Sequence, residues 1–575
     1  MKLLIREYLA SLREREELDA ILPDLLSELG YTVFSRPGRG TVQHGVDIAA
    51  VSPAGPEPSK VYLFSVKKGD LTRNEWNSGT QALRPSLDEI QDAYIPTRIP
   101  QEYAQLKVVI CLCFGGDMQE QVRAAVTGYI SQRSTERISF EEWNGDKLAG
   151  LLLDGVLREE LLPRPLRADF QKAVALLDEP DVAYRHFARL AGQLLEIGGQ
   201  DDRSRVRSAR QLYLAVWVMF VWARDRDNLE APYLASELGL LTLWELLKPL
   251  IETQGSANAD VTRVLHQLIM VHFTIAALFL EQKIAPHVGT RDALAMAVQS
   301  QTAADVNLKL FDILGRMSMT GHWMHWMNLR AGPEVAAARQ EVLDNWRGMA
   351  LTMIENNPAL WLPVTDHQAT DIALFLLFWL VSGTGDNDRI GAWLGSMVDR
   401  LNFTVRTRAH YPIAQTDYRD IVRPAADKSD EVFQERTPGS TLIPTLAAWI
   451  AAMGIRPLSK VLADLVYEKL GHCTMQLWGP DKASEGAFYL HTTNHGRALC
   501  DLPITETGRE LVEIVAEDCK ADKSWEELSA IRTGFDPIIL LACRHWRTPV
   551  PPEIYIASLV GAIEGHQSEP LPGPS

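Results

Sequence analysis

The 575-residue chain has little of what marks several large functional classes. It contains six cysteines and no CxxC pair, which argues against a disulfide framework and fits a reducing compartment. Acidic residues outnumber basic ones by 74 to 57, giving a net charge of -17. A nucleic-acid site would therefore have to be a local basic patch. The charged N-terminal segment lacks the apolar core of a signal peptide. We therefore expect a cytoplasmic protein.

Long apolar runs are also missing from the sequence. The three most apolar stretches are residues 212–223, 268–280 and 372–381. Each is shorter than the roughly 20 residues that a helix needs to cross a bilayer. We expect them to be buried helices of a large helical region, and we expect no membrane partner.

Familiar catalytic motifs are absent as well. The sequence has no GxSxG or HRD motif, and "GTGDND" at 383–388 lacks the Lys-Ser/Thr of a phosphate-binding loop. Some histidines and cysteines invite a zinc interpretation, but without CxxC or HExxH spacing we favour structural roles for them: His472, Cys473, His491, His495 and Cys500.

Two aromatic-rich segments have alternative interpretations. "GHWMHWMNL" at 321–329 is typical of helix packing, although a cofactor or base-stacking site would use the same residues. "ACRHWRTPVPPEIY" contains Arg544, His545 and Arg547. This segment either contacts nucleic acid or a partner, or forms an ordinary surface loop, and we favour the loop.

The pattern of apolar residues divides the chain. Within residues 1–165, a leucine-striped helix at 18–29 precedes strands expected at 31–36, 46–51, 61–67, 106–114 and 137–143, with helices between the later ones. This predicts an α/β domain with a mixed central sheet. From 166 onward helical periodicity dominates. We expect an α-helical domain at 166–425 and a mainly helical region at 426–575, with a hairpin and a disordered tail.

The α/β domain also contains the chemically informative residues. Strand residues alternate between faces, so Ser65 and Lys67 share one face, while Val66 points to the other. Asp47 begins the neighbouring strand. An aspartate and a lysine that meet at a bent strand pair can hold Mg²⁺ and a water molecule beside a phosphodiester.

The order of these elements resembles a known family. "LGY", "GRGTVQHGVDI", "SVK" and "FEEWNGDKLAGLL" follow one another across roughly residues 15–155. This arrangement is similar to the PD-(D/E)xK nuclease superfamily, especially its Mrr-like branch of the restriction-endonuclease type. The resemblance implies a Mg²⁺ (or Mn²⁺) cofactor bound by Asp47 and the carbonyl of Val66. It also implies that Lys67 positions the attacking water.

The resemblance implies a helix acid as well, which alignment places at Asp19, with Glu16 as the fallback. Ser65 departs from the family pattern, because relatives present Glu or Gln at this position. A hydroxyl is a weaker ligand for a hard cation than a carboxylate. Asp19 or Glu75 could compensate for this loss; otherwise the site is inactive.

A modest excess of basic residues surrounds these positions. Between Arg36 and Arg84, seven lysines and arginines face four acids, a local charge of +3. This favours phosphate contact, and ordinary solvated surfaces would give the same count. The expected nucleic-acid contacts are Arg36, Arg39, Lys68 and Arg73.

Together these observations predict a metal-dependent endonuclease that cuts DNA. The small nuclease fused to a large helical region resembles bacterial defence effectors, in which the larger part senses a signal, binds a protein partner or forms a homo-oligomer. Two alternatives stay open. One is a catalytically degenerate scaffold that binds a protein partner or nucleic acid; the other is a ribonuclease of the same fold.

Overall fold

The computed structural model describes residues 6, 9, 18–36, 43–53, 58–77, 82–155, 164–225, 228–252, 257–298, 300, 302–383, 385–423, 427–490 and 496–568. The chain divides into two compact units, Met1–Ala235 and Ser236–Ser575. The boundary falls within helix α11 (Glu230–Ile251). The domain boundaries expected near 165 and 425 stay predictions.

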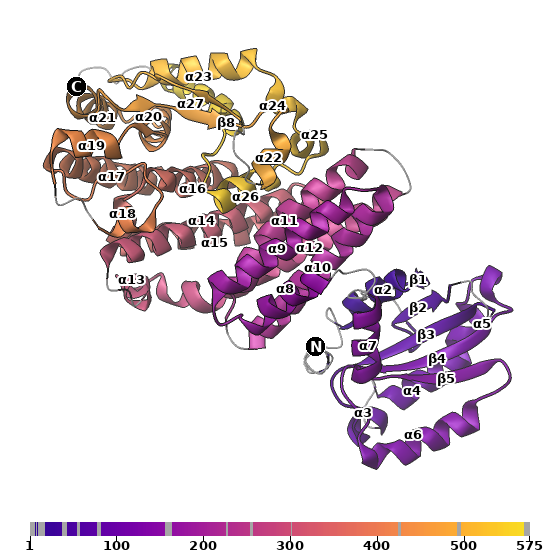
Figure 1. Cartoon of the computed structure of the whole chain (residues 1–575). Helices are drawn as coiled ribbons and strands as arrows, with labels where there is room; N and C mark the ends of the chain where they lie inside the picture. Colours follow the sequence, from indigo (N-terminus) through magenta and orange to yellow (C-terminus); the bar gives the residue numbers. More distant parts are fainter. Residues whose placement is uncertain are drawn as a thin grey trace. The chain divides into compact units, whose positions relative to one another are not determined.

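The first unit contains the mixed five-stranded sheet that the sequence predicts (Figure 1). Its strands follow chain order: β1 (Thr32–Ser35), β2 (Ile48–Val51), β3 (Lys60–Lys67), β4 (Lys107–Phe114) and β5 (Ile138–Trp143). β1, β2 and β3 pair antiparallel, whereas β4 and β5 add in parallel. Parallel neighbours need crossover connections, which explains the helices between β3 and β5. The predicted α/β fold class is confirmed.

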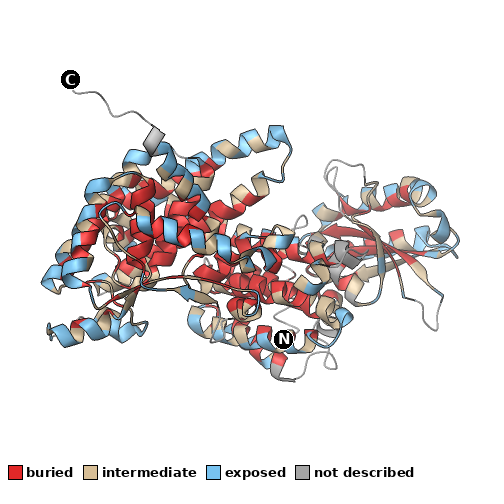
Figure 2. Ribbon diagram, turned by 90° about the horizontal axis from the view of Figure 1, so that it is seen from above, coloured by how far each residue is buried: buried red, intermediate tan, exposed pale blue. Residues whose placement is uncertain are grey.

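Both faces of this sheet are covered. Nearly every residue of β3 and β4 is buried (Figure 2), as continuous apolar runs predict. One face packs in a core that also includes residues of α3 (Arg73–Asn77), α4 (Leu83–Glu89), the π-helical segment η2 (Ile90–Tyr94) and α6 (Glu120–Arg133). The other face has aromatic contacts such as Phe64 with Trp143, whose ring centroids are 4.8 Å apart. Helices α2 (Asp19–Glu28) and α7 (Gly145–Gly155) pack together and against the sheet.

The remaining elements of the first unit are helical. Two short helices, α5 (Ile95–Thr97) and η3 (Gln101–Tyr103), precede β4. Three helices follow α7: α8 (Arg164–Ala175), α9 (Pro180–Gly198) and α10 (Asp202–Asp225). The middle helix, α9, packs against both α8 and α10.

The second unit is mostly helical, as predicted. Its elements up to residue 422 are α12 (Ala257–Phe279), η4 (Leu280–Ile284), η5 (Ala285–His287), α13 (Ala293–Ala297), α14 (Ala303–Asn328), α15 (Pro333–Asn356), η6 (Pro358–Trp361), η7 (Asp366–Gln368), α16 (Ala369–Ser382), α17 (Asn387–Thr407) and α18 (Tyr418–Val422). The remaining elements are α19 (Asp430–Arg436), β6 (Gly439–Ser440), α20 (Leu442–Ala452), α21 (Arg456–Lys469), β7 (Thr474–Met475), β8 (Leu477–Gly479), α22 (Glu485–Leu490), β9 (Arg497–Leu499), α23 (Arg509–Ala521), α24 (Ser524–Glu527), α25 (Ser529–Thr533), α26 (Pro537–Trp546), η8 (Pro552–Ile554) and α27 (Ile556–Ser568). Helix α16 is apolar on every side from Ile372 to Val381 and packs against α14, and a helix of this kind is typically buried.

The apolar runs lie in helices of the structure. Residues 212–223 belong to α10, 372–381 to α16, and 268–280 to α12 and the first residue of η4. Among the described residues, one helical segment, Val261–His287, has the length and composition of a membrane span, and half of its most apolar window is buried. A core helix passes the same test. Residues 569–575 of the predicted disordered tail lie outside the described residues.

Candidate functional site

Asp47 lies where β2 enters the sheet. Its main-chain nitrogen donates to the carbonyl of Phe64 at 2.9 Å, and Ile48 then pairs with Phe64 in the antiparallel register. Because Asp47 bonds to the same Phe64 that Ile48 pairs with, it lies just outside the regular register, at the end of the β2–β3 pair. Ser65 and Lys67 share one face of β3, because side chains alternate along a strand.

A strained turn sets the start of this strand. His44 and Gly45 have positive φ angles of 49° and 76°, and Val46 closes the turn by donating to Gln43. A Cβ atom at position 45 would lie 2.2 Å from the carbonyl oxygen of Ser86 in α4. Only glycine fits both the backbone angle and the space. The turn is thus held directly against α4, two residues before Asp47.

The carboxylate of Asp47 is anchored to the backbone of β3. Its Oδ2 accepts a hydrogen bond of 2.7 Å from the main-chain nitrogen of Val66. The N–H and C=O groups of one strand residue point toward the same neighbour. The carbonyl of Val66 therefore also faces the side of β3 on which Asp47 lies. This brings together the two oxygen ligands that the sequence comparison with nucleases suggested.

Ser65 and Lys67 are both buried. Their residue exposures are 1% and 4%, so this end of the sheet face is closed rather than flat and open. Among the described residues, the hydroxyl oxygen of Ser65 is buried without a hydrogen-bond partner. A buried polar atom without a partner is costly. The hydroxyl can therefore still donate or accept a hydrogen bond.

The negative charge of Asp47 also influences β4. Burial raises the pKa of the Cys113 thiol, and the charge of Asp47 raises it further. Cys113 pairs with Val66 across the β3–β4 ladder. The charge of Asp47 therefore influences a buried thiol of β4, in addition to the hydrogen bond that the carboxylate makes with β3.

The other predicted site residues lie at several places in the first unit. Asp19 is the first residue of α2 and is half-buried, with its Oδ1 atom enclosed. Glu75 lies in the first turn of α3 and is half-buried. Glu16 lies outside the described residues. The membership of Asp19 or Glu75 in the site stays a prediction.

The expected nucleic-acid contacts differ in exposure. Lys68 and Arg73 are exposed, just after β3 and at the start of α3. Arg36 follows β1 and is half-buried, and Arg39 lies outside the described residues. Lys68 and Arg73 therefore offer accessible positive charge beyond the end of β3 that carries Lys67.

The zinc interpretation gains no support from the described residues. Within them, no three or more His, Cys, Asp and Glu side chains form a group that could hold a metal ion. The ring of His472 hydrogen-bonds to Thr437 at 2.8 Å, and Cys473 is buried and reduced. His491 and His495 lie outside the described residues.

The burial of the two aromatic-rich segments distinguishes between their alternative interpretations. His322, Trp323 and Trp326 are buried in α14, which confirms the packing interpretation. The interpretation of the Arg544 segment as a surface loop was wrong. Arg544 is 2% exposed and lies in α26, where it forms ion pairs with Glu237 and Asp312. The charged residues of this segment suggested exposure because their ion-pair partners are far away in the sequence.

Sequence reasoning missed the contact between the turn at Gly45 and α4. The His-Gly pair before Asp47 was a usable signal, since two consecutive residues of this kind favour a left-handed turn. Its packing partner, the carbonyl of Ser86, has no signature in the sequence.

Comparison with known proteins adds no assignment. No protein-family model matches the chain, and neither a curated protein nor a solved structure matches it at a significant level. The function of the protein is therefore inferred from the residues of the candidate site.

Proposed function

We propose that the first unit is a PD-(D/E)xK-type nuclease of the Mrr-like branch that hydrolyses phosphodiester bonds with Mg²⁺ or Mn²⁺, and that its substrate is DNA. One observation carries the proposal. The hydrogen bond from Val66 to the Asp47 carboxylate holds an acid against the strand that also carries the Val66 carbonyl, Ser65 and Lys67. An acid, a main-chain carbonyl and a lysine at the end of a strand pair resemble the sites of that superfamily, in which Glu or Gln stands where this chain has Ser65.

The donor atoms suit a hard divalent cation. Asp47, the Val66 carbonyl and the Ser65 hydroxyl supply only oxygen, and Mg²⁺ commonly binds one or two carboxylates together with water and substrate phosphate. A bound ion of this kind lowers the pKa of its water and stabilises charge on the phosphate. The buried hydroxyl of Ser65 would add a further oxygen to this donor set.

The protein's own groups have separable roles in this proposal. Asp47 is fixed by Val66, so it can bind a cation without first reorganising. Lys67, held at 4% exposure, contributes a positive charge that orients the attacking water and offsets negative charge on the phosphate. Lys68 and Arg73 contact the phosphate backbone farther from the reaction centre, since both are exposed.

The decisive experiment uses the full-length protein with supercoiled plasmid DNA and either MgCl₂ or MnCl₂. We expect cleavage by the wild type and none by Asp47→Asn. The matched control is Asp92→Asn, an exposed aspartate in η2 of the same unit, which should cut at the wild-type rate. Cleavage by Asp47→Asn at the wild-type rate would contradict the assignment of Asp47 to the metal site. A parallel reaction with RNA distinguishes the ribonuclease alternative.

Two observations favour a second candidate function. The neutral Ser65 occupies the position of a second acid, and the described residues hold no group of three metal-ligating side chains. A degenerate nuclease fold that binds nucleic acid or a protein partner without cutting would have these properties. Retention of DNA in a gel-shift assay, with no cleavage in either metal, would favour this scaffold function.

We further propose that the protein acts in bacterial defence, with the helical unit controlling the nuclease through a partner or self-association. The support is the fusion of a unit that contains the α/β sheet, Met1–Ala235, to a larger and mostly helical unit, Ser236–Ser575. Cells that produce the wild type should resist phage infection or plasmid entry better than cells that produce Asp47→Asn. Equal susceptibility at equal protein levels would argue against this role.

A further inference from the structure

The second unit contains a cavity of about 380 Å³ that the proposed nuclease does not use. It lies where the start of α16, β6, the β8–β9 pair and the end of α26 meet. Its lining includes His367, Gln476, Trp478 and Arg547, all partly exposed. Binding sites for small molecules have volumes of roughly 300–1,000 Å³ and combine apolar walls with a few placed polar groups. The cavity meets both criteria.

One wall is a fixed aromatic ring. Trp478 of β8 pairs with Ala498 of β9, and its ring centroid is 5.7 Å from that of Phe488. Gly496 has a φ of +79°, and a Cβ there would lie 2.4 Å from Cζ2 of Trp478. The position of the indole is thus fixed by the tilted contact with Phe488 and by the backbone at Gly496, which approaches the edge of the ring. A ring held in this way can stack a planar ligand at little cost in conformational entropy.

Two polar side chains on the cavity lining can recognise the edge of such a ligand. Nδ1 of His367 lies 3.1 Å from the carbonyl oxygen of Arg547. A carbonyl oxygen only accepts, so Nδ1 carries the hydrogen and Nε2 of the neutral ring is an acceptor. The amide of Gln476 offers a donor, and its oxygen, which accepts from the Cys500 thiol at 3.7 Å, has a second lone pair. The backbone nitrogen of Gln476 is held by Ser440 at 3.0 Å. This set complements the mixed donors and acceptors of a nitrogen heterocycle.

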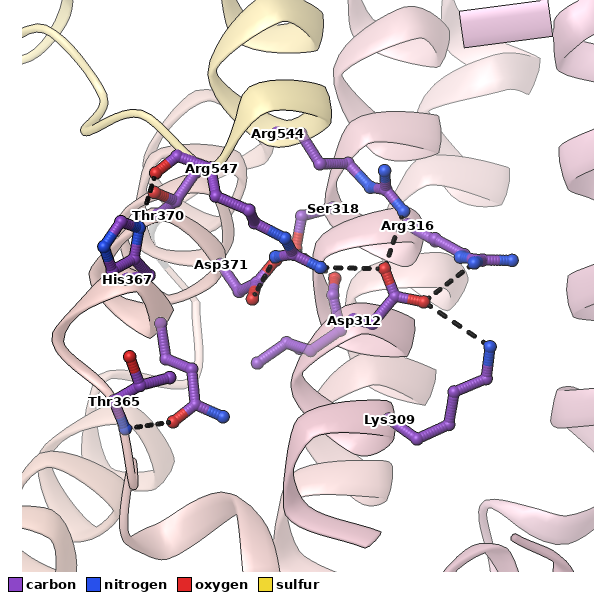
Figure 3. A network of polar contacts seen from close by, with 12 residues as sticks. Lys309, Asp312, Arg316, Ser318, Thr365, His367, Thr370, Asp371, Arg544 and Arg547 are labelled. Carbon is purple, nitrogen blue, oxygen red and sulfur yellow. Dashed lines mark hydrogen bonds and ion pairs between the residues drawn. The ribbon is translucent and has the colours of Figure 1, made fainter. Parts of the chain in front are cut away.

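The charged residues beside the cavity are already paired (Figure 3). Nη1 of Arg547 lies 2.7 Å from both oxygens of Asp371, and Nη2 lies 2.9 Å from Asp312. The carboxylate of Asp366 accepts hydrogen bonds from Ser440, Thr441 and Leu442. Both terminal nitrogens of the guanidinium are therefore engaged by carboxylates, although Asp312 is shared with Lys309, Arg316 and Arg544, and a phosphate would have to displace these contacts.

We propose that this cavity binds an uncharged, planar nitrogen heterocycle of nucleoside size, stacked on Trp478 and hydrogen-bonded to His367 and Gln476. This site is separate from the proposed nuclease and does not depend on it. It gives the helical unit a small-molecule binding function of its own.

The test is calorimetric titration of the full-length protein with adenosine, guanosine, cytidine and uridine. We expect at least one of them to bind in a 1:1 ratio. His367→Asn keeps a donor for the Arg547 carbonyl but removes the Nε2 acceptor, and Gln476→Leu removes the amide while keeping the side chain's size. Each should weaken binding about tenfold, the effect of one lost hydrogen bond in a polar site.

Matched controls keep the outcome interpretable. His410→Asn changes an exposed histidine with a φ of 52°, which asparagine tolerates, and Gln434→Leu changes an exposed residue of α19. Both should bind like the wild type, and a nucleoside that binds should raise the melting temperature of the wild type. Absence of binding by all four nucleosides at millimolar concentration would overturn the proposal. Equal weakening of nucleoside binding in the control variants would show that the ligand binds elsewhere. Tighter binding of the 5′-monophosphates would show that the ligand is charged.

Discussion

The main-chain nitrogen of Val66 lies 2.7 Å from Oδ2 of Asp47, so the acid that precedes β2 is held by the backbone of β3. Hydrogen bonds to a carboxylate are stronger than those between neutral groups. The acid's position therefore depends on the register between β2 and β3 and on the turn that leads into β2. Substitutions that disturb either one should affect the site even when they leave its side chains unchanged.

Gly45→Ala should both destabilise the first unit and reduce cleavage. The new Cβ would lie 2.2 Å from the Ser86 carbonyl at a φ of +76°. Relief requires the turn to move away from α4, and Asp47 is only two residues farther along. We expect a loss of roughly 2 kcal/mol or more in the free energy of unfolding. Chemical denaturation and the plasmid assay measure the two effects.

The control for this prediction is Gly128→Ala in α6. Nothing lies within 4 Å of a Cβ at that position, and alanine stabilises a helix interior by about 0.5–1 kcal/mol relative to glycine. Stabilisation of both variants would show that the turn at Gly45 can adapt.

Ser65→Ala should separate a catalytic role from a structural one. The Ser65 hydroxyl is buried without a partner among the described residues, so its removal should change the free energy of unfolding by less than about 1 kcal/mol. If the hydroxyl helps to hold a metal ion, the variant should need more Mg²⁺ for half-maximal cleavage. An unchanged Mg²⁺ requirement would place the hydroxyl outside the metal site.

Ser65→Glu tests the same position in the opposite direction. A carboxylate is the group that related nucleases present there, and it binds a hard cation better than a hydroxyl. The residue is 1% exposed, so the larger side chain should cost about 1–3 kcal/mol in stability through overpacking. Calorimetry should nevertheless detect tighter Mg²⁺ binding than in the wild type. Unchanged or weaker binding by a folded variant would contradict the ligand assignment.

Local sequence patterns were sufficient for the sheet. Residues 108–114 form one continuous apolar run, which predicts a fully buried strand, and all of them are buried in β4. The alternation in "SVK" predicts that Ser65 and Lys67 share one face, because side-chain direction in a strand has a period of two, and both residues are buried in β3. The hydrogen bond from Val66 connects this strand with Asp47, which precedes β2.

Distant contacts were not predictable in this way. Arg544 and Glu237 are 307 residues apart in the chain, and no local pattern relates them. A single arginine near an aromatic residue is equally compatible with a surface loop and a buried ion pair. The decisive information is the packing of α26 against neighbouring helices, which depends on the tertiary fold.

Arg544→Ala should destabilise the second unit strongly. Nη1 of Arg544 contacts both oxygens of Glu237 at 2.7 and 2.8 Å, and Glu237 is fully buried. Removing one partner leaves a buried charge without compensation, which typically costs 3–5 kcal/mol. Denaturation should register this loss, whereas Arg406→Ala, which breaks an exposed ion pair with Glu468, should leave stability almost unchanged. Similar losses in the two variants would contradict the argument from burial.

Asp371 should make the stability of the second unit depend on pH. Burial raises its pKa to about 6, in spite of the neighbouring Arg547. An acid whose pKa is raised by folding stabilises the fold below its ordinary pKa of 3.8, and this contribution is lost as the pH rises through 6.

Buried histidines act in the opposite sense over part of the same range. Burial lowers the pKa of His272 and of His322 to about 4. Their contribution therefore grows as the pH rises from about 4 to their ordinary value of 6.5. The wild-type profile alone mixes these effects with that of Asp371.

A comparison with Asp371→Asn isolates the aspartate, because both proteins contain the same histidines. Asparagine stays neutral at every pH. The variant therefore lacks the pH-dependent contribution to the free energy of unfolding that Asp371 makes in the wild type and that the wild type loses as the pH rises. The free energy of unfolding of the variant, relative to the wild type, should increase by on the order of 2–3 kcal/mol between pH 4 and pH 7.5. Urea denaturation at half-unit pH intervals measures this difference directly. A difference that stays constant over the range would mean that Arg547 holds Asp371 ionised throughout, and that the ion pair outweighs burial.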